Sequence, residues 1–143
     1  MEKCWDPFPY KDEDHEEFAA DLAQLWKETE AKIDEKTQII LMTHEGPYGS
    51  STAQNVYFDR DGIDVTTYHT GDKSLRELML ANQHRVVCNI HGHSHDGSFI
   101  QNIGQPCQVL PVINPGSLGQ GEFAELKITK TQQGKWKVTS ATK

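Results

Sequence analysis

A short apolar run leads directly into three histidines in the stretch Arg85-Val86-Val87-Cys88-Asn89-Ile90-His91-Gly92-His93-Ser94-His95. A nearly continuous apolar run of this length is typical of a strand that is buried in a parallel sheet. A second such run occurs earlier in the chain, Gln38-Ile39-Ile40-Leu41-Met42, and it leads into Thr43-His44. The sequence therefore predicts two buried parallel strands, each followed by histidine.

A helix is predicted between these two strands. Ser74-Leu75-Arg76-Glu77 has the S-x-x-E spacing of a capping box, which opens a helix that runs to about Gln83. Leu75, Leu78 and Met79 are predicted to form its inner face. Strand, helix and strand in this order indicate a β-α-β crossover within a parallel sheet.

The regions on either side of this unit differ in pattern. Residues 12–35 are predicted to form a helix, because apolar residues recur there at helical spacing and predict one buried face. These residues are Phe18, Leu22, Leu25, Trp26 and Ile33. Residues 50–71 are polar, with a turn signal at Asp61-Gly62 and a predicted short strand at 65–68.

From Ser98 onward the pattern changes to short strands, predicted at 98–103, 108–113, 122–129 and 135–140. The last two are predicted to form a hairpin across Gln132-Gln133-Gly134. One face of that hairpin is predicted to carry Leu126, Ile128, Trp136 and Val138.

Composition indicates one globular domain in a reducing compartment. The 143 residues are 36% hydrophobic and 24% charged, with 14 Lys and Arg against 21 Asp and Glu, a net charge of 14 − 21 = −7. This balance argues against a nucleic-acid-binding patch.

The three cysteines form no C-x-x-C pair, which argues against a disulfide scaffold and indicates an intracellular, cytoplasmic protein. We expect no membrane span, since no apolar stretch approaches the ~20 residues required, and no signal peptide.

Both predicted strands place histidine at their carboxyl ends, where ligand sites lie in open α/β sheets. If the two strands are neighbours, His44 and residues 91–95 reach the same crevice. Gly92 and Gly97 are expected to let the histidine loop turn tightly. Imidazole is a suitable ligand for Zn, Fe, Mn or Ni, so we predict a metal-binding site here.

Three motifs in this order resemble the calcineurin-like metallophosphoesterase family: Thr43-His44-Glu45-Gly46-Pro47, Gly92-His93-Ser94-His95 and Asn114-Pro115-Gly116-Ser117-Leu118-Gly119. The resemblance covers about residues 38–129. It implies the C-terminal half of a metallophosphoesterase-type α/β sandwich, in which a β-α-β unit is followed by short antiparallel strands.

The resemblance also implies roles for individual residues. His44 and His93 correspond to ligands of one metal ion, and His95 to a ligand of the other. His91 has no counterpart in the family's ligand set; we expect it to orient the loop through a backbone hydrogen bond or to face the substrate. Asn114 lies in an implied structural turn beside the site. Such sites use two divalent ions about 3.5–4 Å apart, here Mn, Fe, Zn, Ni or Mg, to hydrolyse a phosphate mono- or diester.

Part of the family's site is missing from this sequence. The family also uses Asp-x-His, Gly-Asp and Gly-Asn-His-Glu motifs before the position of His44, and residues 1–43 contain none of them. Gly71-Asp72 follows His44 and is interpreted as the lead-in to the helix at Ser74. The bridging carboxylate, the Asn ligand and the leaving-group histidine are therefore expected in a missing N-terminal half or in a second chain. Residues 1–143 are predicted to be a single, incomplete domain with an exposed apolar sheet edge.

Several explanations fit this incompleteness: a fragment of a longer protein, an incomplete gene sequence, one of two complementary chains, or a reduced domain with a different task. A catalytically inactive scaffold or interaction subunit is the alternative to a hydrolase, and its exposed edge would suit docking. A lone zinc site of His91, His93 and His95 is a third interpretation. Alternate residues of an extended segment point to opposite sides, which argues against it. The substrate and the oligomeric state are not specified by the sequence.

Overall fold

The computed structural model describes residues 12–58, 65–106 and 108–143. Its two α-helices and eight strands are α1 (Asp12–Glu30), β1 (Ile39–Thr43), β2 (Gln54–Phe58), β3 (Val65–His69), α2 (Lys73–Ala81), β4 (Val86–His91), β5 (Ile100–Gln105), β6 (Gln108–Ile113), β7 (Glu125–Lys130) and β8 (Trp136–Thr142). Two short 3-10 turns, η1 (Ser51–Ala53) and η2 (Leu118–Gln120), complete the described part of the chain.

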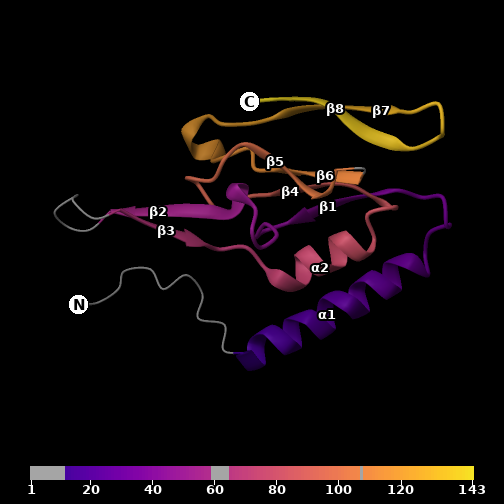
Figure 1. The fold of residues 1–143 in the computed structure, drawn as a ribbon, viewed down its shortest axis with the longest axis horizontal. Helices are drawn as coiled ribbons and strands as arrows, with labels where there is room; N and C mark the ends of the chain where they lie inside the picture. Colours follow the sequence, from indigo (N-terminus) through magenta and orange to yellow (C-terminus); the bar gives the residue numbers. More distant parts are fainter. Residues whose placement is uncertain (1–11, 59–64, 107) are drawn as a thin grey trace.

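The centre of the molecule is a mixed four-stranded sheet in the order β1-β4-β6-β5. Strands β1, β4 and β6 are parallel, and β5 is antiparallel to β6. Figure 1 shows α1 and α2 on one side of this sheet and the β7–β8 hairpin on the other. The fold is therefore of the mixed α/β class, and the parallel pairing of β1 with β4 confirms the predicted crossover.

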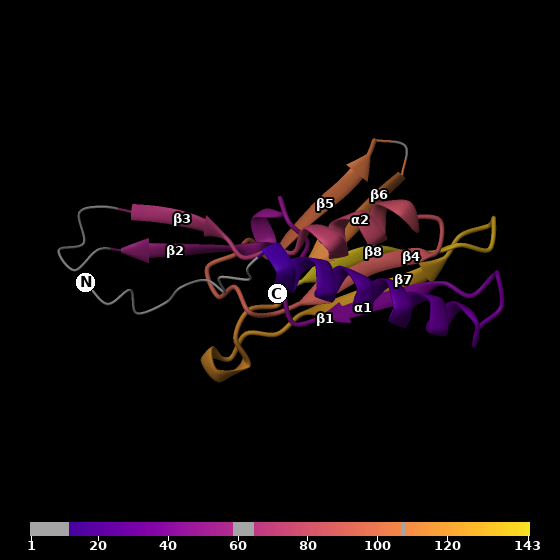
Figure 2. The same cartoon turned by 90° about the horizontal axis from the view of Figure 1, so that it is seen from below.

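The antiparallel pair β2–β3 forms a separate ribbon. Seen from below, this ribbon extends away from the four-stranded sheet (Figure 2). The predicted strand at 65–68 is confirmed as β3. The predicted turn at Asp61-Gly62 lies outside the described residues.

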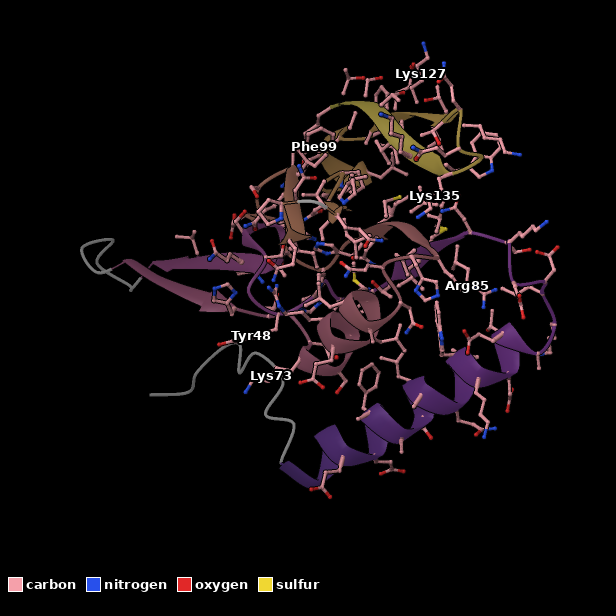
Figure 3. All side chains as sticks on the ribbon, turned by 45° about the vertical axis from the view of Figure 1, so that its right-hand side comes forward. Tyr48, Lys73, Arg85, Phe99, Lys127 and Lys135 are labelled. Atoms are coloured by element: carbon pink, nitrogen blue, oxygen red, sulfur yellow. The ribbon has the colours of Figure 1, made fainter. Side chains whose placement is uncertain are left out.

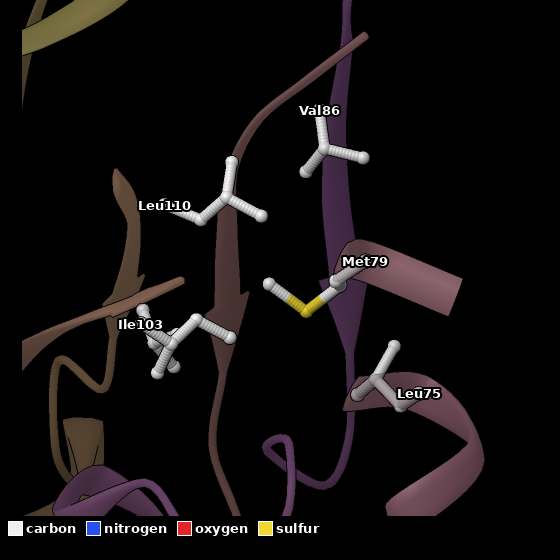
Figure 4. Packing of buried hydrophobic residues seen from close by; sticks show 6 residues of the cluster. Leu75, Met79, Val86, Ile103 and Leu110 are labelled. Carbon is white, nitrogen blue, oxygen red and sulfur yellow. The ribbon is translucent and has the colours of Figure 1, made fainter. Parts of the chain in front are cut away.

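Apolar residues are buried on both faces of the central sheet. Beneath the helices, Leu75 and Met79 of α2 pack against Val86, Ile103 and Leu110 (Figure 4). Full burial of a side chain such as Met79 contributes about 1.5–3 kcal/mol to folding.

Beneath the hairpin, a second cluster forms around Val87, Cys88 and Ile113, against which Leu126, Ile128 and Val138 pack. Strand β4 thus contributes buried residues to both faces, Val86 to the helix side and Val87 and Cys88 to the hairpin side, as expected for an interior parallel strand.

The helix predicted over 12–35 is shorter than expected. It ends at Glu30, where the next amides turn back tightly: Lys32 N donates to Thr29 O, and Ile33 N donates to Glu30 O. Leu22 and Trp26 pack against the core, but the predicted burial of Phe18 and Leu25 is wrong. Those two side chains are 42% and 61% exposed, because α1 contacts the core along a narrow stripe.

Helix α2 begins two residues earlier than the capping box at Ser74 predicted. Asp72 is the N-cap, with extended backbone, and its carboxylate accepts a hydrogen bond from Leu75 N. Ser74 instead lies inside the first turn. A carboxylate both caps the free amides and faces the positive end of the helix dipole, which explains why Asp72 takes this position.

Strand β1 lies at an edge of the sheet and is not buried as predicted. Its face toward the hairpin side is open, with Ile40 41% and Met42 79% exposed. The exposed apolar edge that the sequence led us to expect is therefore present in the described part of the chain.

The β7–β8 hairpin is confirmed, but Trp136 is 46% exposed instead of contributing fully to its inner face. Trp136 lies at the first position of β8, where its amide donates to the side-chain oxygen of Gln38. The described helices include none long and apolar enough to cross a membrane.

Candidate metal centre

His44 and His93 lie next to each other beyond the carboxyl ends of two adjacent strands. The parallel register pairs Thr43 with His91, so the residues that follow each strand emerge side by side. His93 Nδ1 is 3.1 Å from His44 Nε2, and the ring centroids are 4.9 Å apart in an edge-on arrangement. Two imidazole nitrogens bound to one tetrahedral ion at about 2.0–2.1 Å lie about 3.3 Å from each other. The pair therefore fits two ligand positions of a single ion.

His95 does not join this pair as a third ligand. Its side chain is exposed, and its charge is felt by His93 and by Glu122. Within residues 12–58, 65–106 and 108–143, no group of three His, Cys, Asp or Glu side chains is spaced to share an ion. The described residues thus bring His44 and His93 together, with one further histidine, His95, nearby.

Both electrostatics and burial favour the neutral form of His93. Burial lowers the pKa of His93, and the neighbouring charges of His44 and His95 lower it further. A neutral imidazole keeps a nitrogen lone pair, which is the form that binds metal ions. The arrangement therefore keeps His93 in its metal-binding state at neutral pH.

His91 is buried, and both nitrogens of its ring are hydrogen-bonded to groups other than histidine. It is 3% exposed, with Nδ1 2.9 Å from Gly92 O and Nε2 2.8 Å from Thr52 Oγ1. Burial lowers the pKa of His91, the Gly92 hydrogen bond opposes this, and the charge of His93 lowers it again. The backbone hydrogen bond expected of His91 is present. Its second nitrogen is occupied by Thr52, which argues against the lone zinc site.

The tight turn of the histidine loop falls on His93 instead of Gly92. His93 has a φ of 63°, and Ser94 N donates to Gly92 O at 2.7 Å. A three-residue turn with positive φ at its centre is the rare and strained form of the γ-turn. Holding a non-glycine residue there costs roughly 1–3 kcal/mol. Strain at a candidate ligand indicates that its surroundings fix its position.

Glycine is required by close approach elsewhere around the loop. A Cβ on Gly46 would lie 2.5 Å from the ring of His91. At Gly97, a Cβ would collide with the carbonyl group of Thr52. These contacts pack the loop after β1 against His91, and the end of the histidine loop against Thr52.

Asn114 ties the histidine loop to the 3-10 turn η1. It is 2% exposed, and its Nδ2 donates to Thr52 O at 2.9 Å and to Ser94 O at 2.6 Å. Its Oδ1 accepts from Gly116 N at 3.0 Å, within a turn where Gly116 has a φ of 90°. The position of Asn114 is that of a structural residue beside the histidines.

The sequence pattern did not single out Thr52, Ser50 and Thr70, which lie in the polar segment 50–71. Ser50 Oγ is 2.7 Å from Thr52 Oγ1, and Thr70 Oγ1 is 2.7 Å from Ser94 Oγ. The run Ser50-Ser51-Thr52 was the available signal, because hydroxyl residues often form local turns. Nothing in the sequence showed that this turn would contact His91.

Two carboxylates near the loop are engaged in other interactions. Asp96 accepts a hydrogen bond from Val56 N. Glu122 is paired with Lys143 at 2.6 Å and accepts from Ser117 N, and these two contacts lower its pKa. Neither carboxylate belongs to a three-ligand group with the histidines.

Comparison with known proteins found no match: none of the family models, none of the curated proteins and none of the solved structures corresponds to this chain. Assignment of function therefore rests on the motifs and on the geometry described above.

Proposed function

We propose that this chain supplies part of a two-metal site that hydrolyses a phosphate mono- or diester, in a domain of the calcineurin-like metallophosphoesterase type. The observation that carries the proposal is the pair His44 and His93, whose nitrogens face each other at 3.1 Å beyond two adjacent parallel strands. The motifs that contain these residues support it, as does the helix–sheet–hairpin layering, which is compatible with the C-terminal half of such a sandwich (Figure 1).

Each histidine has a distinct task under this proposal. His44 and His93 hold one divalent ion, and His95 contributes to the second. Bound divalent ions would polarise the phosphoryl oxygens and supply hydroxide at neutral pH. His91 and Asn114 do not touch the ions; they hold the loop that carries the ligands.

The remaining ligands come from another segment or chain. Three neutral imidazoles carry no charge to balance two divalent ions, and phosphoesterase sites need carboxylates for that purpose. The exposed apolar residues Ile40 and Met42 on the edge strand support the same view, because a partner that extends the sheet would cover them.

Metal binding by the purified chain tests the proposal. We expect Zn²⁺ or Mn²⁺ to bind measurably by titration calorimetry, and His44→Ala or His93→Ala to weaken binding at least about 10-fold, as expected for loss of a direct ligand. His84→Ala is the matched control, since His84 is exposed and precedes β4 at the opposite end of the sheet. Equal affinity in all three variants would contradict the proposal.

A catalytically inactive interaction subunit is the second candidate, favoured by the open edge of β1 and by the absence of a three-ligand group in the described residues. Replacing His44, His93 and His95 together by alanine separates the two functions. A scaffold keeps its partner binding after this change, whereas a phosphoesterase subunit loses metal binding and any activity of the assembled domain.

A further inference from the structure

Thr52 belongs to none of the motifs found in the sequence. It contacts His91, the histidine of the loop that is not a metal ligand in the proposed site. Its Oγ1 lies 2.8 Å from His91 Nε2, and both residues are buried. Buried polar pairs of this kind either stabilise the fold alone or hold a neighbouring group in place. The contacts made by the rest of the His91 ring distinguish these roles.

The hydrogen bonds around His91 run in one direction. Gly92 O can only accept, so the nitrogen that faces it, His91 Nδ1, carries the hydrogen. The neutral ring then presents Nε2 as an acceptor to the hydroxyl of Thr52. Ser50 Oγ, 2.7 Å from Thr52 Oγ1, can donate in turn. A chain of donors thus leads from Ser50 through Thr52 and His91 to the carbonyl of Gly92.

That carbonyl is also the acceptor of the strained turn at His93. Ser94 N donates to Gly92 O across His93, whose φ is 63°. Gly92 N donates to His44 O, so the amide and the carbonyl group of Gly92 are both hydrogen-bonded. The position of Gly92 O therefore sets the direction in which the His93 ring leaves the backbone.

We propose that Thr52 is a positioning residue: through His91 it holds the Gly92 carbonyl, and thereby the turn that directs His93 toward His44. This inference deepens the proposed function and rests on it for its metal-binding consequence. Thr52 also belongs to η1, directly before β2, and its own carbonyl is bonded to Asn114. The Thr52 side chain thus connects the base of the β2–β3 ribbon to the loop of the candidate ligands, alongside the hydrogen bonds of Asn114 and Thr70.

The test compares Thr52→Val, which keeps the shape but removes the hydroxyl, with Thr52→Ser, which keeps the hydroxyl. Long-range ¹H–¹⁵N correlation spectra at pH 7.5 report which imidazole nitrogen of His91 carries hydrogen. We expect the Nδ1–H form in the wild type and in Thr52→Ser. In Thr52→Val we expect a mixture of forms, because without the Thr52 hydroxyl the ring is no longer held against Gly92 O. Titration with Zn²⁺ should show about 10- to 100-fold weaker binding by Thr52→Val only.

Thr139→Val is the control, because the Thr139 hydroxyl donates to Lys127 O on the exposed hairpin. The inference is overturned if Thr52→Val keeps the Nδ1–H form and the wild-type Zn²⁺ affinity. If that variant does not fold, the wild-type spectrum decides: an Nε2–H form of His91 would contradict the donor chain, and an Nδ1–H form supports it. A wild-type chain that binds no Zn²⁺ contradicts the proposed function, while the spectra still decide the role of Thr52.

Discussion

The two ends of strand β4 are each held by a buried polar side chain, but in different ways. At the amino end, Arg85 donates to Glu30 Oε1 at 3.0 Å, Asp34 O at 2.9 Å and Thr37 O at 3.3 Å. At the carboxyl end, the ring of His91 is held between Gly92 and Thr52. Arg85 fastens α1 and the following turn to the sheet (Figure 3), whereas His91 fastens a loop that carries candidate ligands.

This difference shows where structural and functional demands separate. Arg85 faces only acceptors and remains charged, which suits a structural tie between segments. Burial lowers the pKa of His91 and so favours its neutral form. Its own φ is not positive, but it supports the strained turn at His93. Changes at the first end should affect stability alone, and changes at the second should affect stability and the site together.

The largest expected effect is at Arg85. Arg85→Ala removes an ion pair and two hydrogen bonds to carbonyl groups, and should lower the free energy of unfolding by about 2–4 kcal/mol. Arg85→Lys should recover only part of this, because lysine lacks the planar group that reaches several acceptors. Urea unfolding measures the free energy of unfolding of both variants. Metal affinity should not change, and a fall in affinity would show that the two ends are not independent.

A smaller loss of stability is expected at His91. His91→Ala leaves the hydrogen of the Thr52 hydroxyl without its acceptor and removes the ring that packs against Gly46, at a cost of about 2 kcal/mol. Zn²⁺ affinity should fall as well, unlike in Arg85→Ala. A loss of stability with unchanged Zn²⁺ affinity would show that His91, like Arg85, stabilises the fold and does not position the candidate ligands.

At His93, two substitutions separate backbone strain from side-chain chemistry. His93→Gly relieves the positive φ, so it should be more stable than His93→Ala by about 1 kcal/mol in urea unfolding. Both variants should lose metal binding. If the alanine variant proves equally stable, the turn is not strained as described.

Acid should weaken the carboxyl end of β4 selectively. Burial lowers the pKa of His91 and of His93 below the usual 6.5. In the window between these lowered values and about pH 6.5, the unfolded chain binds more protons than the folded chain. Stability from these residues is therefore fully present above about pH 6.5 and is lost as the pH falls through that window.

Urea unfolding at a series of pH values measures this effect in the wild type, with His91→Ala as the comparison. The variant should show a shallower loss below pH 6.5. Parallel profiles for the two proteins would indicate that other groups cause the acid sensitivity.

The smallest effect concerns Cys88, inside β4 between the two ends. Burial raises the pKa of its thiol to about 11. At pH 8 we expect no alkylation of Cys88 by iodoacetamide in the folded chain and rapid alkylation in urea, followed by peptide mass spectrometry. Modification of the native protein would mean that β4 opens locally more often than its burial indicates.

Much of the fold followed from local pattern. The apolar runs predicted β1 and β4, and their parallel pairing is what placed His44 and His93 together. The capping signal at Ser74 lies two residues after the true N-cap, Asp72, because several polar residues near a helix start compete for the same free amides. Burial was predicted less well: Leu25 and Met42 are apolar but exposed, since periodicity shows which residues share a face and not what covers it.

The sequence by itself determined the strand–helix–strand order and the presence of histidine at two strand ends, because hydrophobic pattern and chain order are local properties. Only the tertiary structure decided that His93 would carry the turn and that His91 would face Thr52, 39 positions away along the chain. Contacts over such separations depend on how loops pack after the sheet has formed. The composition of a polar segment such as 50–71 holds no periodic signal that could specify them.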